Sequence, residues 1–104
     1  MSEGAYQRVA DIAEIAPGSV KAVEIEGCSI LLCHSEGRIF AIENQCSHAQ
    51  EPLECGRMKA GRIACPAHGA RFDLETGEAL SYPATEPIRV FPVRIEGDSI
   101  LVAL

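Results

Sequence analysis

The chain is organised around Cys46-Ser47-His48 and, after a gap of sixteen residues, Cys65-Pro66-Ala67-His68-Gly69. Each of these two short loops contains one cysteine and one histidine. The sequence therefore supplies four candidate metal ligands in two matched pairs: Cys46, His48, Cys65 and His68. Two thiolates with two imidazoles suit either a tetrahedral zinc ion or a 2Fe-2S cluster in which two histidines replace two cysteines on one iron.

The mixing of ligand types within each loop favours the cluster. Structural zinc sites usually pair two cysteines in one loop and two histidines in another. A cluster of two irons is long, so each loop could place its cysteine on an inner iron and its histidine on an outer iron. Zinc stays open as the alternative cofactor at this point.

The double motif resembles that of the Rieske-type 2Fe-2S proteins. The similarity continues from Cys65 through Gly69-Ala70-Arg71-Phe72-Asp73 to Thr76-Gly77, and the chain has the length of a stand-alone Rieske ferredoxin. The resemblance implies one 2Fe-2S cluster. It implies that Cys46 and Cys65 hold the buried ferric site, whereas His48 and His68 hold the outer iron that becomes ferrous on reduction.

Three departures from the respiratory members of this family indicate a low reduction potential. Those members carry an extra cysteine in each loop, joined as a disulfide, and a serine that donates a hydrogen bond to the cluster. This chain has Glu51 and Ala67 at the cysteine positions and Ala70 at the serine position. Hydrogen-bond donors stabilise the more negative reduced state, so their absence predicts a potential near the low end of the Rieske range, about −150 mV.

Composition predicts one soluble globular domain over residues 1–104. The chain is 47% hydrophobic, has no apolar run long enough to span a membrane, and lacks the features of a secretory signal at its N-terminus. We therefore expect a cytoplasmic monomer. The net charge of −6 argues against binding to nucleic acid or anionic membranes. It favours a partner with a basic docking patch, although solubility alone would account for the charge equally well.

Short apolar runs between turn residues predict an all-β fold, an antiparallel sandwich or barrel of eight to ten short strands. A small cluster-binding subdomain, at about residues 44–83, is expected as an insertion in this base. The second ligand loop should lie at the tip of a hairpin.

The hydrophobic period slips near Phe91-Pro92 and predicts a β-bulge there. By resemblance, Pro83 belongs to a loop that covers the cluster. The expected strands cover residues 6–10, 20–25, 28–33, 38–43, 63–64, 70–73, 88–95 and 99–104.

The remaining cysteines and histidine have no predicted role in the site. Cys28 and Cys33 are an odd number of residues apart on one expected strand, so they should point to opposite faces and cannot form a disulfide with each other. We expect both to be small buried hydrophobic residues. Cys55 is interpreted as incidental, and His34 as a surface residue at the end of a strand.

This inventory excludes catalysis by the chain itself. With His48 and His68 used as ligands, one histidine remains, too few for the mononuclear iron site of an oxygenase. The sequence also has no glycine-rich phosphate loop for a nucleotide. The resemblance implies a one-electron carrier between an NAD(P)H-dependent flavoprotein reductase and a terminal aromatic ring-hydroxylating oxygenase, with transient docking through the His48/His68 tip.

Two other functions stay open. The first is a small Rieske subunit of a reductase such as nitrite reductase. The second is a zinc-stabilised interaction module, which would need the same four ligands but no sulfide.

Overall fold

The computed structural model describes residues 6–47, 52–66, 69–82 and 86–104. Its regular structure consists of short strands and one 3-10 helix, η1 (Ile12–Glu14), which confirms the all-β prediction. In these ranges, no helix has the length and hydropathy that a membrane crossing requires. The strands are β1 (Tyr6–Asp11), β2 (Val20–Ile25), β3 (Cys28–Ser35), β4 (Arg38–Glu43), β5 (Arg57–Lys59), β6 (Arg62–Ala64), β7 (Arg71–Asp73), β8 (Val90–Phe91), β9 (Val93–Glu96) and β10 (Ser99–Ala103).

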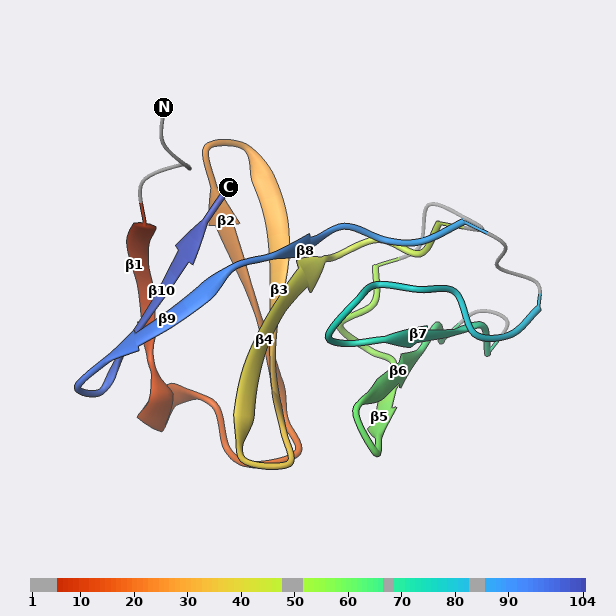
Figure 1. Ribbon diagram of the computed structural model, residues 1–104, viewed down its shortest axis with the longest axis horizontal. Helices are drawn as coiled ribbons and strands as arrows, with labels where there is room; N and C mark the ends of the chain where they lie inside the picture. The colour runs from red at the N-terminus through yellow and green to blue at the C-terminus, as the bar shows by residue number, and fades with distance from the viewer. Residues whose placement is uncertain (1–5, 48–51, 67–68, 83–85) are drawn as a thin grey trace.

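The strands form three antiparallel sheets (Figure 1). One has the order β1-β10-β9 and joins the two ends of the described chain. The central sheet has the order β2-β3-β4-β8. The third, β5-β6-β7, comes from the segment between β4 and β8 and lies at the opposite end of the molecule from the termini. Its place in the chain agrees with the predicted insertion, but the boundaries at 44 and 83 stay a prediction.

Strand β3 is buried on both faces, which explains its unbroken apolar run. Leu31 and Cys33 point into a core shared with the β5-β6-β7 unit, whereas Ile30 and Leu32 point into a core shared with β1 and β10. All four are 0% exposed. Burying a leucine or isoleucine side chain fully contributes about 1.5–3 kcal/mol. The central sheet therefore anchors both the sandwich and the unit that carries the ligand loops.

Three hairpins are closed by two-residue turns of the same kind. Glu26-Gly27, Glu36-Gly37 and Ala60-Gly61 each have both φ angles between 51° and 84°. Two successive positive φ angles define the type I′ turn, whose twist matches that of the flanking strands. These turns fix the pairing of Ile25 with Cys28, Ser35 with Arg38, and Lys59 with Arg62.

The bulge predicted at Phe91-Pro92 is wrong. Phe91 ends β8, which pairs with β4 in the central sheet, and Val93 begins β9, which pairs with β10 in the other sheet. Pro92 lies between them, and its carbonyl accepts a hydrogen bond from the Ala103 amide at 3.1 Å. The slip in the hydrophobic period therefore marks the point where the chain crosses from one sheet to the next.

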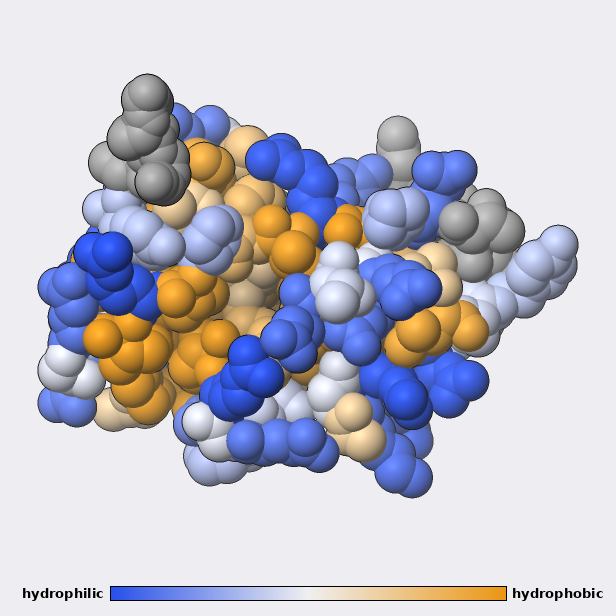
Figure 2. Space-filling view, viewed as in Figure 1, coloured by the Kyte–Doolittle hydropathy of each residue, from blue (hydrophilic) through white to orange (hydrophobic). Residues whose placement is uncertain are grey.

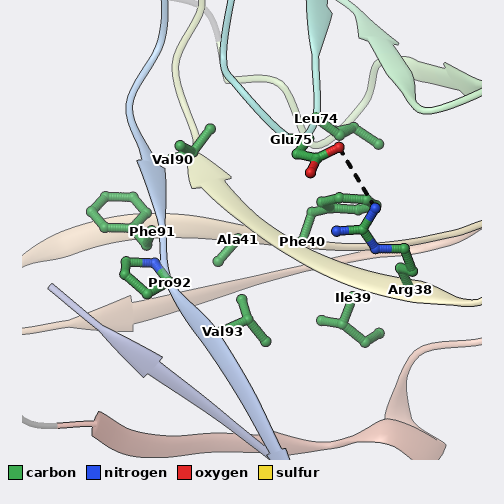
Figure 3. A pocket seen from close by; sticks show the side chains of 10 residues that line it. All are labelled: Arg38, Ile39, Phe40, Ala41, Leu74, Glu75, Val90, Phe91, Pro92 and Val93. Carbon is green, nitrogen blue, oxygen red and sulfur yellow. Dashed lines mark ion pairs between the residues drawn. The ribbon is translucent and has the colours of Figure 1, made fainter.

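A hollow of about 370 Å³ lies where β4, β8 and β9 meet the turn after β7 (Figure 3). An exposed ion pair spans it, between Arg38 Nη1 and Glu75 Oε1 at 3.6 Å, and links β4 to this turn. The Arg38 guanidinium also lies 4.8 Å from the centre of the Phe40 ring. Figure 2 shows hydrophobic residues gathered on this face over β8 and β9. Among the described residues that line the hollow, none is a cysteine or a histidine.

Candidate metal centre

The two cysteines of the motif lie in one buried core. Cys46 follows β4 and Cys65 follows β6, and each is 2% exposed. Both belong to the hydrophobic cluster between the central sheet and the β5-β6-β7 unit. Residues nineteen positions apart in the sequence are thus brought into one core by two different sheets. His48 and His68 lie outside the described residues.

The second ligand loop sits at the end of the β6–β7 hairpin, as predicted. The Cys65 amide donates to the Ala70 carbonyl at 2.7 Å, and the Gly69 amide donates to the Cys65 carbonyl at 2.8 Å. Gly69 has φ +75°, in the region that side-chain-bearing residues rarely adopt. The glycine lets the chain reverse within a few residues and hold Cys65 against the core.

The first ligand loop is braced by Asn44, a residue that the sequence analysis did not single out. Its side-chain nitrogen donates to Ser29 Oγ at 3.1 Å and to Glu54 Oε1 at 3.0 Å, and its side-chain oxygen accepts from the Leu53 amide at 2.9 Å. Asn44 is 8% exposed. One buried amide thus joins the chain before Cys46 to the chain after the loop. Its position directly after a strand was the available signal.

Ser47, between the two predicted ligands of the first loop, ties that loop to a third segment. Its hydroxyl donates to the Glu86 carbonyl at 2.6 Å. Glu86 begins the described stretch that leads back to β8. The loop around Pro83, predicted to cover the cluster, lies outside the described residues, but this contact brings its C-terminal end to the first ligand loop.

The other cysteines divide by burial. Cys33 is fully buried, as predicted, but Cys28 is exposed, so the prediction that it is a buried hydrophobic residue is wrong. Cys28 is the first residue of β3, directly after the Glu26-Gly27 turn. Cys55 is exposed and lines a hollow of about 300 Å³ beside Cys65.

His34, predicted to be a surface residue at the end of a strand, is more enclosed than expected. The ring is half-buried, and its Nδ1 lies 2.8 Å from the Ile15 carbonyl oxygen. Its backbone amide also donates to Ser19 and its carbonyl accepts from Gly18. His34 therefore fastens the β1–β2 connection to β3, and its role is structural.

Burial of Cys33 makes an alkaline loss of stability testable. Desolvation raises the pKa of this thiol from 9.0 to about 12. The folded state keeps the proton, whereas the unfolded state releases it above pH 9, so stability is complete below pH 9 and falls as the pH rises toward 12. Between pH 8 and pH 10.5, we expect Cys33 to cost about 2 kcal/mol of the free energy of unfolding.

Urea unfolding of the wild type and of Cys33→Ala at both pH values measures this effect. The alanine variant is less stable at pH 8 because of the lost side chain, but its stability should fall less on going to pH 10.5. Parallel losses in the two proteins would contradict the assignment.

The comparisons with known proteins identify the family. The Rieske [2Fe-2S] domain matches residues 5–92 of the chain. The chain therefore belongs to the Rieske [2Fe-2S] family, and its cofactor is a Rieske 2Fe-2S cluster.

Individual relatives agree with this membership. The chain is 40% identical over 91 residues to the naphthalene 1,2-dioxygenase system ferredoxin component of Pseudomonas aeruginosa, with 88% of each chain covered. The ferredoxin of carbazole 1,9a-dioxygenase from Nocardioides aromaticivorans IC177 has a similar structure, with a TM-score of 0.90 and 35% identity over 94% of this chain and 96% of that one. A ferredoxin solved in complex with the oxygenase of carbazole 1,9a-dioxygenase gives a TM-score of 0.88 at 28% identity, covering 94% and 92%.

The described residues fit the part of this cofactor that cysteines bind. A Rieske cluster needs two cysteine thiolates at the iron that is shielded from solvent. Cys46 and Cys65 meet that need, since they are buried, lie in one core and come from separate loops. In the ranges that the structure describes, no group of three or more possible ligands is assembled, and the two predicted histidine ligands lie outside those ranges.

Proposed function

We propose that the chain is a one-electron carrier, the ferredoxin component of an aromatic ring-hydroxylating dioxygenase system. It takes electrons from an NAD(P)H-dependent flavoprotein reductase and passes them to a terminal oxygenase. The relatives named as ferredoxin components support this role, as does the ferredoxin solved together with its oxygenase. The observation that carries the proposal is that Cys46 and Cys65, on two separate loops, are buried in one core at one end of an all-β fold.

The ligands follow from the motif and the burial together. Cys46 and Cys65 would hold the cluster on its buried side, and His48 and His68 would hold it on the side toward solvent. When bound, the cluster stores a single electron. The protein contributes rigid ligand positions: Asn44 braces the first loop, and the Cys65–Ala70 hydrogen bond closes the second.

A carrier of this kind needs to dock briefly and release quickly. Because we propose His48 and His68 as the ligands on the solvent side of the cluster, the partner would approach that side, where the path for the electron is short. A small interface supports fast exchange. We propose that the chain acts as a monomer in the cytoplasm.

The test uses the holoprotein with its cognate reductase and terminal oxygenase. With NAD(P)H present, the reductase should reduce the chain by one electron for each cluster, and the oxygenase should then reoxidise it when aromatic substrate and oxygen are added. Omission of the chain should stop hydroxylation. If the reductase leaves the cluster oxidised, the carrier function is wrong.

Gel filtration separates this function from the role of a reductase subunit. A transient carrier should elute alone from a mixture with its partners at physiological salt. Coelution as a stable complex with a nitrite reductase would favour the alternative that the sequence left open.

Ala70 offers a test of the predicted low potential. It is 0% exposed, lies in the same core as Cys46 and Cys65, and occupies the position of the serine donor in other family members. We expect a midpoint of about −150 mV for the wild type. We expect Ala70→Ser to raise it by about 60 mV, since one hydrogen bond that favours the reduced state by about 1.4 kcal/mol shifts a one-electron couple by that amount.

Potentiometric titration of both proteins, followed by EPR, measures the two midpoints. Ala79→Ser is a suitable control, because Ala79 packs against the same core without lying in a ligand loop. A wild-type midpoint well above zero would contradict the placement.

A further inference from the structure

The outward face of the β5-β6-β7 sheet is strongly basic. Residues directly opposite each other in antiparallel strands point to the same face. Two cross-strand rows therefore share one face. The first row consists of Arg57, Ala64 and Arg71, and the second of Lys59, Arg62 and Asp73. The opposite face carries Met58, Ile63 and Phe72, which pack into the core.

Four of the nine basic residues in an acidic chain thus share one small sheet. The others are engaged elsewhere. Four form ion pairs with acidic residues, and Arg89 lies over the Phe91 ring. Within the described part of the chain, none of the four on this sheet has an ion pair. The ion-paired residues are Arg8, Lys21, Arg38 and Arg94.

The arrangement is unfavourable for the isolated protein. Lys59 and Arg62 stand directly opposite each other across the Ala60-Gly61 turn, and like charges at such positions destabilise a sheet. Asp73 lies on the same face, but its Oδ1 accepts hydrogen bonds from the Glu75 and Thr76 amides at 2.8 and 3.0 Å. An external anion would relieve the repulsion.

The basic face is also hollowed and lies next to the metal centre. A groove of about 350 Å³ is lined by the four basic side chains with Ala60 and Ala64. A second hollow, of about 300 Å³, is lined by Cys55, Cys65, Pro66 and Gly69 and shares Arg57 and Ala64 with the groove. Ala64 directly precedes Cys65. An anionic group in the groove would therefore lie beside the second ligand loop.

We propose that this groove, lined by Arg57, Lys59, Arg62 and Arg71, is the docking site for a carboxylate-rich surface of the electron donor, the flavoprotein reductase. The inference rests on the proposed carrier function. Nucleic acid and anionic membranes present extended negative charge, which the net charge of −6 would repel. A protein partner can place a few carboxylates on the basic groove while the rest of its surface lies away from the acidic parts of this chain.

Charge also selects the donor over the acceptor. One electron moves from the reduced flavin to the oxidised cluster, and no bond changes. The carrier then holds one more negative charge, which weakens its attraction to an acidic surface. Docking on an acidic donor therefore favours the oxidised carrier and releases the reduced one. An acidic acceptor would bind the oxidised carrier, which has no electron to give, more tightly than the reduced one.

The test compares two variants with equal loss of charge. Arg57→Gln/Arg62→Gln removes two positive charges from the groove, and Lys21→Gln/Arg94→Gln removes two from other sheets. Stopped-flow spectroscopy measures reduction of each oxidised holoprotein by the NAD(P)H-reduced cognate reductase at several salt concentrations. At low salt, the groove variant should react about fivefold more slowly than the wild type and depend less on salt, and the control should stay within about twofold. Reoxidation by the oxygenase should be unaffected in both.

Three results would overturn the proposal: equal slowing in the two variants, no slowing in either, or slowing of the oxygenase step in place of the reductase step. Circular dichroism and the EPR signal of each variant verify that the fold and cluster are intact. Failure of the carrier function itself gives a different result, since the wild type would then be reduced by dithionite but not by the reductase.

Discussion

Cys65→Ala should yield a protein without a cluster. Cys65 is one of the two buried thiols that we propose as ligands of the iron, and alanine supplies no ligand in its place. We expect the purified variant to be colourless, with iron and acid-labile sulfide reduced by more than tenfold. Cys46→Ala should give the same result. Visible absorption, EPR and iron analysis of the purified proteins measure it.

Cys55→Ala and Cys33→Ala are the matched controls for this experiment. Cys55 is an exposed thiol on the rim of the hollow beside Cys65, and Cys33 is a buried thiol in the same core as both proposed ligands. Both variants should keep a full complement of iron and sulfide. Retention of the cluster in Cys65→Ala, or its loss in Cys33→Ala, would show that the ligand cysteines are misassigned.

Gly77→Ala should lower the free energy of unfolding by about 2–5 kcal/mol. Gly77 has φ +80°, and a Cβ at this position would overlap the Ile88 carbonyl oxygen. The strained backbone costs about 1–2 kcal/mol, and forcing an atom into a packed site adds about 1–3 kcal/mol. The Ile88 amide also donates to the Gly77 carbonyl at 2.9 Å. The overlap would therefore disturb the contact between the turn after β7 and the segment that leads to β8.

Gly37→Ala isolates the contribution of the overlap. Gly37 has nearly the same backbone conformation, φ +78°, but a Cβ there would have no heavy atom within 4 Å. We expect this variant to lose only about 1–2 kcal/mol. Urea unfolding of the two variants and the wild type, followed by circular dichroism, gives the comparison. Equal losses would mean that the Gly77–Ile88 contact is not tight.

Local patterns allowed much of the base to be predicted. The ranges expected for β2 and β4 agree with the structure residue for residue. A turn that ends in glycine marks one end of each strand, Glu26-Gly27 after β2 and Glu36-Gly37 before β4. Strand β3 is two residues longer than expected and ends at Ser35, because the Glu36-Gly37 turn pairs Ser35 with Arg38.

Features that depend on several segments together could not be predicted. The crossing at Pro92 looks like a bulge in one sequence, since a period slip does not show whether the strand changes its partner. Strand β5 escaped prediction because three residues, two of them charged, carry too little pattern. Because β5 was not predicted, the cross-strand pairing that places the four basic residues of the groove on one face could not be predicted either. Net charge alone suggested the opposite, a partner with a basic patch.

The cofactor of the metal centre could be predicted from the sequence, but the contacts that hold its ligand loops in place could not. The residue types and their spacing in two loops led to the 2Fe-2S cluster, and the family comparison confirms that cofactor. The bracing by Asn44 arises from contacts with Ser29 and Leu53, which lie fifteen and nine residues away, and no periodic pattern announces it. The roles of His48 and His68 stay a prediction.

The most direct test of the central claim is an EPR spectrum of the dithionite-reduced protein, with iron and acid-labile sulfide counted on the same sample. We expect a rhombic Rieske signal and equal amounts of iron and sulfide, two of each per chain. An EPR-silent protein that contains zinc and no sulfide would contradict the account, and the chain would then be a zinc-stabilised interaction module.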